Sequence, residues 1–333
     1  MKARSSASGA LGLLAAATLS AAVAAGCGPG FAPPNRLNSP RVLAIKSDPV
    51  APAFGDTTML SAETYAPNGV SLLYDWSWCP VALAPGAPCP ITDEQLLQLV
   101  GMPVSLHLGS DATVPFVHNI PVDRLELLCG PTSPLPALDC TDGFPVQLRL
   151  VVCTESDQNL CQDVAHAVEA VRPMRLRFRP GDQANANPTI TGLHALLMDG
   201  MDPADLTVAA SPPTLIRHKE TVITADINPD ADAEMYDGLD DDSMPAKLYE
   251  RLTLSWFVES GDTNHLRTSY IRGTTATGNA SDRIKWTPAF LKDEKDSLRD
   301  DKTLSRVIVV IRDNREGVAW IEGSARLVEE TTP

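Results

Sequence analysis

Positive charge is scarce in this chain. Its 333 residues include 27 Lys and Arg against 42 Asp and Glu, which gives a formal net charge of −15. A protein with this balance repels nucleic acid and anionic lipid, because both carry dense negative charge. We therefore expect no nucleic-acid partner.

Familiar catalytic and metal-binding motifs are absent as well. The sequence has no GxSxG elbow, no HExxH motif, no glycine-rich phosphate loop, and no CxxC or CxxH spacing. Its six histidines are scattered and form no HxH or HxxxH pair, which disfavours a zinc site. We expect a protein that is not an enzyme, with a catalytic site assembled from distant residues as the open alternative.

Long runs of Ala, Leu, Glu and Lys, typical of helical proteins, are also missing, whereas 28 Pro and 21 Gly indicate many turns. Short β-rich runs recur between these turn signals. Leu72, Tyr74, Trp76 and Trp78 alternate with other residues in the pattern of a half-buried strand. In the first half, strands are predicted at Val42–Ile45, Thr57–Tyr65, Leu72–Cys79, Val146–Cys153 and Val164–Val171.

A Pro-rich insertion, residues 80–145, interrupts these strands. Thr92 and Gln95 form a capping-box pattern that predicts one short helix at Asp93–Val100. The composition of the rest indicates a loop that is ordered by disulfides and not by a core.

The second half repeats the plan of the first. Leu252–Trp256 corresponds to Tyr74–Trp78, and the apolar run Val307–Ile311 corresponds to Leu148–Val152. The short connection Asp313–Gly317 then predicts a hairpin. In this half, strands are predicted at Pro188–His194, Thr221–Ile227, Arg251–Val258, Leu266–Arg272, Arg283–Thr287, Leu304–Arg312 and Val318–Val328.

Two sets of short strands, each with a central Trp and a terminal hairpin, resemble bacterial Ig-like β-sandwiches, including PKD and cadherin-like modules. The strands of Trp78 and Trp256 look like the central strand of that fold. No cysteine lies in Thr57–Tyr65, so the inter-sheet disulfide of antibody domains is missing. The resemblance implies an all-β protein with two tandem antiparallel Ig-like sandwich domains, at residues 41–180 and 187–330.

Seven cysteines are present, and six of them follow residue 27. An even number in an exported chain indicates disulfides, for which fifteen pairings are possible. We expect neighbours to pair, because each pair brackets a short turn-rich segment, and closing such a loop contributes about 2–3 kcal/mol. The predicted pairs are Cys79–Cys89, Cys129–Cys140 and Cys153–Cys161.

The first 26 residues have the pattern of a secretory signal. Lys2 and Arg4 precede an apolar, alanine-rich run. The sequence Ala24-Ala25-Gly26-Cys27 resembles the lipobox of bacterial lipoproteins, which implies cleavage before Cys27 and acylation of its thiol. The alternative is an ordinary signal peptide that is cut near Ala25.

The resemblance to lipoproteins also implies a location. Gly28 stands where inner-membrane lipoproteins have Asp, which favours the outer membrane, with the membrane itself as a partner through the lipid anchor. Residues 27–40 are rich in Pro, Gly and Asn and are predicted to be a flexible tether.

The only concentration of basic residues is Arg172, Arg175, Arg177 and Arg179. The last three alternate with apolar residues, which predicts a strand with guanidinium groups on one face. Such a face can bind phosphate or carboxylate through bidentate hydrogen bonds. The alternative is that these arginines neutralise carboxylates of the protein itself.

The most acidic stretch approaches the spacing of a calcium loop. Its candidate ligands are Asp226, Asn228, Asp230, Asp232, Glu234 and Asp237. Ala231 replaces the turn-forming glycine of an EF-hand, and Asp237 replaces its bidentate Glu. A solvated acidic loop is the alternative to a calcium site.

Together these patterns predict a non-enzymatic lipoprotein of the cell envelope that acts as a binding or structural module. Its partner would be an envelope protein or a glycan, and the 80–145 insertion would be the binding surface, because long ordered insertions on rigid scaffolds are often functional. The competing hypotheses are a calcium-stiffened adhesion module and, third, an envelope hydrolase.

Overall fold

The computed structural model describes residues 34–81, 87–131, 133, 138–154, 167–196, 202–239, 243–272, 282–288 and 303–330. Residues 35–333 form one compact unit. The signal peptide and Cys27 lie outside the described residues. No helix within the described ranges is long and apolar enough to cross a membrane.

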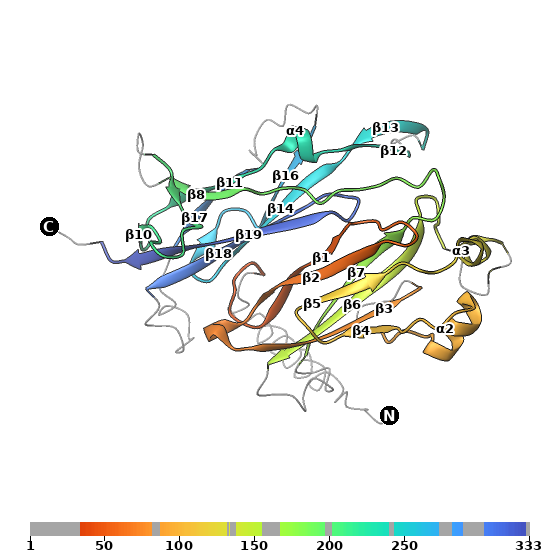
Figure 1. Cartoon of the computed structure of the whole chain (residues 1–333). Coiled ribbons are helices and arrows are strands. Elements are labelled where there is room, and N and C mark those ends of the chain that lie inside the picture. The colour runs from red at the N-terminus through yellow and green to blue at the C-terminus, as the bar shows by residue number, and fades with distance from the viewer. Residues whose placement is uncertain are drawn as a thin grey trace, which may run out of the picture. The chain divides into compact units, whose positions relative to one another are not determined.

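The chain is an all-β protein made of sandwich-like sheets, as predicted (Figure 1). In the first half, one sheet has the strand order β1-β2-β5 and the other has the order β4-β3-β6-β7. The strands are β1 (Arg41–Asp48), β2 (Thr57–Tyr65), β3 (Leu72–Cys79), β4 (His107–Gly109), β5 (Thr113–Val117), β6 (Phe144–Thr154) and β7 (Val168–Leu176).

In the second half, the sheets have the orders β10-β19-β18-β14-β16 and β15-β17-β11-β8-β9, and β12 and β13 form a separate hairpin. The strands are β8 (Gly192–Leu196), β9 (Ala204–Asp205), β10 (Thr214–Ile216), β11 (Thr221–Asp226), β12 (Met235–Leu239), β13 (Pro245–Tyr249), β14 (Arg251–Val258), β15 (Asp262–Thr263), β16 (Arg267–Ile271), β17 (Arg283–Thr287), β18 (Leu304–Arg312) and β19 (Val318–Val328).

The predicted internal repeat is visible in the strand pairing. β3 pairs with β6 as β14 pairs with β18, and the hairpin β6–β7 corresponds to the hairpin β18–β19. In the other sheets, β1, β2 and β5 are arranged as β8, β11 and β17 are. The corresponding strands also follow one another in the same order along the chain, so both halves use one plan.

Each half buries its own core, and tryptophans lie at the centre of both. Trp76 and Trp78 are fully buried between the sheets of the first half, and Trp256 and Trp286 are fully buried in the second. Trp76 and Trp78 occupy the alternating positions of β3 that the sequence pattern predicted. The division into domains 41–180 and 187–330 stays a prediction.

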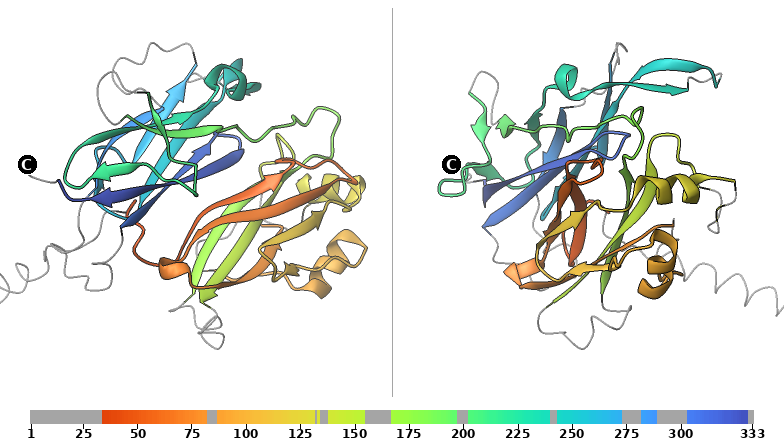
Figure 2. Two further views of the ribbon diagram at one scale, coloured as in Figure 1. Left: turned by 60° about the vertical axis from the view of Figure 1, so that its left-hand side comes forward. Right: turned by 45° about the vertical axis from the view of Figure 1, so that its right-hand side comes forward.

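The 80–145 insertion differs from the expectation of a loop without a core. Its helix α2 (Asp93–Val100) has the predicted capping box at Thr92 and Gln95, but a second helix, α3 (Val122–Cys129), and two strands follow. Strand β5 pairs with β2. Figure 2 shows the two short helices next to the strands of the first half.

This insertion therefore contributes to the core that it was expected to lack. Its buried side chains include Leu96, Val100, Val114, Phe116, Leu125 and Leu128. The signal for α3 is weak because Pro121 at its N-cap provides no side-chain hydrogen bond.

The two halves also share a third group of buried side chains. On β14 and β18, residues alternate between the core of the second half and the opposite face of the sheet. On that opposite face, Ile308 and Val310 pack with residues of the first half. The members are Leu37, Leu43, Ala44, Tyr65, Ile308, Val310 and Val318. This explains the continuous apolar run of β18, since a strand that is covered on both faces needs apolar residues at every position.

Candidate binding site

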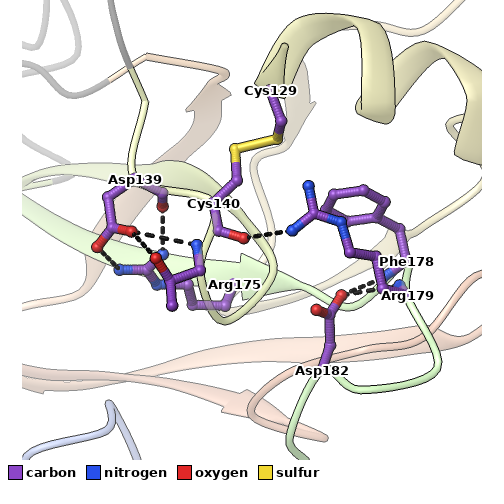
Figure 3. The surroundings of a disulfide bond; sticks show 8 residues. Cys129, Asp139, Cys140, Arg175, Phe178, Arg179 and Asp182 are labelled. Atoms are coloured by element: carbon purple, nitrogen blue, oxygen red, sulfur yellow. Dashed lines mark hydrogen bonds and ion pairs between the residues drawn. A yellow bond between two sulfur atoms is a disulfide. The ribbon is translucent and has the colours of Figure 1, made fainter. Parts of the chain in front are cut away.

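The predicted arginine row begins within β7, which contains Arg172 and Arg175, and continues just after it with Arg177 and Arg179. Met174, Leu176 and Phe178 are buried on one face, as the alternation predicted. On the other face, however, the guanidinium groups bind the protein's own backbone (Figure 3). Arg175 donates to the carbonyl oxygen of Asp139 at 2.6 Å, and its guanidinium lies 3.6 Å from the Asp139 carboxylate.

The remaining arginines of the row have partners of the same kind. Arg179 donates to the carbonyl of Cys140 at 2.8 Å and covers the Phe178 ring at 4.4 Å, while Arg177 donates to the carbonyl of Ala51 at 2.8 Å. Arg172 donates to the carbonyl of Ile45. The row therefore holds neighbouring loops through their backbone carbonyls. Of Arg175, Arg177 and Arg179, only Arg175 also lies beside a carboxylate, as the alternative of neutralised carboxylates expected.

Two of the three predicted disulfides are present. Cys79 bonds to Cys89, and Cys129 bonds to Cys140. The Cys129–Cys140 bond joins the end of α3 to the loop whose carbonyls accept from Arg175 and Arg179 (Figure 3). The third predicted pair, Cys153–Cys161, includes Cys161, which lies outside the described residues.

The acidic stretch does not form one ligand loop. Residues Pro229–Asp232 form the short helix α4, capped by the side chain of Asn228, and β12 begins at Met235. The first half of the stretch is held by separate partners. Asp226 lies 2.8 Å from His194, and Asp232 accepts from Thr189 at 3.0 Å.

The other carboxylates of the stretch are equally dispersed. Asp230 accepts from Tyr270 and lies 3.8 Å from Arg272, whereas Asp237 lies 2.6 Å from Lys247 on β13. The backbone N–H of Glu234 donates to Glu250. Within the described ranges, no group of three or more His, Cys, Asp or Glu side chains is placed to hold a metal ion.

A different group of arginines lines a cleft where the halves meet. On β14, Thr253 and Ser255 lie on the face away from the core, where Thr253 is opposite Arg312 of β18 and Ser255 is opposite Arg267 of β16. A cavity of about 470 Å³ is bounded by these residues. Its lining is Arg41, Val42, Leu43, Thr253, Ser255, Phe257, Arg267, Arg312 and Asp313.

A second cavity of about 380 Å³ shares Val42, Leu43, Arg312 and Asp313 with the first. Arg172 and Glu316 also line it, between apolar walls of β1 and β7. We call the two cavities together the arginine cleft. Their volumes lie in the range of about 300–1,000 Å³ that is typical of ligand sites.

Three arginines of the arginine cleft form no ion pair with the described residues. Among the described residues, no carboxylate lies within 4.0 Å of Arg172, Arg267 or Arg312, while such pairs hold Arg306 and Arg315. Burial and the nearby positive charge of Arg267 lower the pKa of Arg312. Burial likewise lowers the pKa of Arg172 to about 10, against the attraction of Glu316 and Asp313.

Two acidic side chains complete the site. Asp313 is held in its own turn, where it accepts the backbone N–H groups of Arg315 at 2.8 Å and Gly317 at 2.7 Å. Glu316 has a φ of 80°, a strained value for this residue type. Burial raises the pKa of Glu316, although Arg172 and Arg175 oppose the shift.

Of the predicted site residues, only Arg172 belongs to the arginine cleft. The other residues that line it come from the turn after β18 and from six strands, β1, β7, β14, β16, β18 and β19, so no local motif marks them. One signal was nevertheless present, because the unbroken apolar run before Arg312 indicates that both faces of β18 are covered. An arginine at the end of such a strand has limited access to water.

No protein-family model matches this chain, and no curated protein matches it. Solved structures are similar over most of its length. One is a carbohydrate-binding module of the β-sandwich superfamily, with 10% identity, coverage of 87% of this chain and 100% of that chain, and a TM-score of 0.23.

Two further solved structures show similarity at the same low level. Red sea bream transglutaminase has 8% identity, coverage of 89% of this chain and a TM-score of 0.22, and the match spans 32% of that enzyme. The Bacteroides ovatus protein SGBP-B, solved with a mixed-linkage heptasaccharide, has 8% identity, coverage of 88% and 71% of the two chains, and a TM-score of 0.17. Similarity at this level carries no conclusion about ligand or activity.

Proposed function

We propose that this protein is a non-enzymatic binding module of the bacterial cell envelope, anchored by acylated Cys27, and that its ligand binds in the arginine cleft. The observation that carries the binding role is the placement of Arg267, Arg312 and Arg172 around two cavities that share lining residues, with no carboxylate of the described residues in ion-pair distance. In a chain with a net charge of −15, nearby carboxylates would be expected to neutralise such a group. A site kept positive and partly shielded from water binds anions strongly, since electrostatic attraction increases as the dielectric falls.

The arrangement supports binding better than catalysis. Among the described residues, no histidine or cysteine lines either cavity. Asp313 shares the larger cavity with Thr253 and Ser255, but its carboxylate accepts backbone N–H groups of its own turn and forms no hydrogen bond to either hydroxyl among the described residues. The cleft therefore lacks the hydrogen-bonded pair of nucleophile and base that activates a hydroxyl. The sandwich instead places rigid strands around the cleft, which is the scaffold that a preorganised binding site needs.

The anchor rests on the lipobox resemblance. An acylated Cys27 would carry several chains, each buried methylene contributing about 0.8 kcal/mol, and so would bind the membrane stably. Outer-membrane attachment would confine the cleft to the envelope and raise the effective concentration of any ligand there.

Expression of the full chain in a bacterial host tests the anchor. Wild type is expected in the membrane fraction, with an N-terminal peptide that begins at acylated Cys27 in mass spectrometry. The Cys27→Ser variant is expected to lose both properties. A wild-type N-terminus at Gly26 without lipid would refute the anchor.

Crosslinking and co-purification from the native envelope test the binding role. Wild type is compared with Arg267→Gln, which alters the cleft, and with Arg251→Gln, which removes an exposed arginine at the other end of the β14–β16 pair. A partner recovered by wild type and Arg251→Gln, but not by Arg267→Gln, supports the proposed site. Equal recovery by all three places the binding surface elsewhere.

A further inference from the structure

The donors and acceptors of the arginine cleft define the kind of molecule that fits it. Arg267 has no hydrogen-bond or ion-pair partner among the described residues. Arg312 has N–H groups left for a ligand, because a guanidinium carries five of them. Within the described residues its hydrogen bonds go to Ser255 Oγ at 3.4 Å and to the carbonyl of Leu43. Their shared cavity therefore presents two guanidinium groups to a single anion.

The two carboxylates of the cleft, Glu316 and Asp313, restrict which kinds of anion can bind there. Glu316 has no hydrogen bond or ion pair among the described residues, and it lines the same cavity as Arg172. A ligand beside it is favoured when it donates hydrogen bonds to the carboxylate. A phosphate monoester is disfavoured there, because its charge of about −1.5 to −2 at neutral pH is repelled by Glu316 and Asp313.

The remaining lining is a mixture of hydroxyl groups and apolar surface. Thr253 and Ser255 offer hydroxyls that donate or accept, while Val42, Leu43 and Phe257 provide apolar contacts. Sugar rings present both kinds of surface. The two cavities, which share four lining residues, have volumes of about 380 and 470 Å³ and so offer room for more than one ring.

From this arrangement we infer that the arginine cleft binds a sugar acid, with the sugar carboxylate between Arg267 and Arg312 and hydroxyl groups directed at Glu316. This inference rests on the proposed function and names the ligand class of the same site. The planar guanidinium fork matches a carboxylate through two parallel hydrogen bonds. The free monosaccharide and a unit of an acidic polysaccharide share this chemistry.

Calorimetric titration of the soluble Cys27→Ser chain tests the inference with four probes: trigalacturonate, galacturonate, the neutral galactotriose and inorganic phosphate. Trigalacturonate is expected to bind at least about tenfold more tightly than galactotriose or phosphate, because charge-assisted hydrogen bonds are about twice as strong as neutral ones. Tighter binding of trigalacturonate than of galacturonate indicates a polysaccharide unit. Equal binding of the two indicates the free monosaccharide.

Variants locate the binding within the cleft. Arg267 is exposed, so Arg267→Gln should fold, and it is expected to weaken trigalacturonate binding by about 10- to 100-fold, the effect of losing a charged hydrogen-bond partner. The matched control Arg251→Gln is expected to bind like wild type. In Glu316→Gln, the ratio of the affinity for trigalacturonate to the affinity for phosphate is expected to be smaller than in wild type.

Three outcomes overturn the inference: equal affinity for trigalacturonate and galactotriose, tighter binding of phosphate, or no change in Arg267→Gln. These outcomes are distinct from failure of the proposed function. If a native envelope partner is lost in Arg267→Gln while no sugar acid binds, the cleft is the site and the ligand class is wrong. If the partner is retained in Arg267→Gln, the site itself is wrong.

Discussion

Glu63 on β2 is half-buried and lies near Glu322 of β19. Burial, followed by repulsion from Glu322, raises the pKa of Glu63 to about 7, although Arg306 opposes the shift. The folded state therefore holds a proton on Glu63 more tightly than the unfolded state, whose pKa is the ordinary value of 4.5. Its contribution to stability is largest below about pH 4.5 and is lost as the pH rises through about 7.

Replacing this carboxyl with an amide should remove that pH dependence. We expect Glu63→Gln to become more stable relative to wild type by about 1–3 kcal/mol between pH 4.5 and pH 8. Urea unfolding at a series of pH values measures the difference. Glu126→Gln, an exposed position on α3, serves as the control, and a stability difference for Glu63→Gln that is independent of pH would contradict the prediction.

The sequence predicted the environment of a residue best where its partners lie close to it in the chain. Local patterns predicted the burial of Met174, Leu176 and Phe178. They also predicted the two disulfides, each of which joins cysteines close together in the sequence. Arg41, Arg267 and Arg312 are far apart in sequence. The pairing of β14 with β16 and β18 brings Arg267 and Arg312 to one cavity, and the packing of β1 against β18 adds Arg41. The backbone carbonyls that bind Arg175 and Arg179 likewise have no signature in the sequence.

Strand β18 is buried on both of its faces, and each face belongs to a different group of buried side chains. Val307, Val309 and Ile311 belong to the core of the second half, whereas Ile308 and Val310 pack against the first half. A residue of the second set therefore stabilises the contact between the halves. Its removal leaves a cavity that surrounding strands cannot fill.

Truncation of Ile308 tests this arrangement. Because the side chain is fully buried, Ile308→Ala should lower the free energy of unfolding by about 2–5 kcal/mol. Leu304→Ala on the same strand, at a position that is 44% exposed, should lower it by less than about 1 kcal/mol. Denaturant titration measures both, and equal losses would show that the shared core is not formed.

The dispersed carboxylates around α4 allow a prediction about calcium. Because Asp226, Asp230 and Asp237 are held by His194, Arg272 and Lys247 respectively, we expect millimolar calcium and chelator to give the same melting midpoint. A site occupied at 100 times its dissociation constant would add about 2.7 kcal/mol. A melting midpoint that is clearly higher in calcium than in chelator would contradict this prediction and support the calcium-stiffened module.

Strands with a clear alternating or continuous apolar pattern were predicted well, and those without one were not. Strands β14, β17, β18 and β19 begin and end where the sequence pattern placed them. Strand β8 begins later than predicted, since Pro188 cannot donate to a ladder. The hairpin β12–β13 was missed because its strands are short and follow an acidic turn that dominated the pattern. Strand β7 extends past Pro173, which an edge strand tolerates.

At the scale of the whole molecule, the contact between the halves creates the candidate site. Tyr65 of the first half donates to Glu259 of the second at 2.9 Å, and Arg306 lies 3.1 Å from the same carboxylate. Where this packing ends, Arg41 and Arg172 from the first half and Arg267 and Arg312 from the second surround the cleft. Neither half contains the complete site, so the sequence pattern of one half alone cannot predict it.

A crystal structure of the soluble chain with trigalacturonate tests the central claim most directly. We predict density for the sugar in the arginine cleft, with one carboxylate within hydrogen-bonding distance of both Arg267 and Arg312. Density in which the sugar instead contacts the 80–145 insertion or the row Arg175–Arg179, with an empty cleft, would contradict the account.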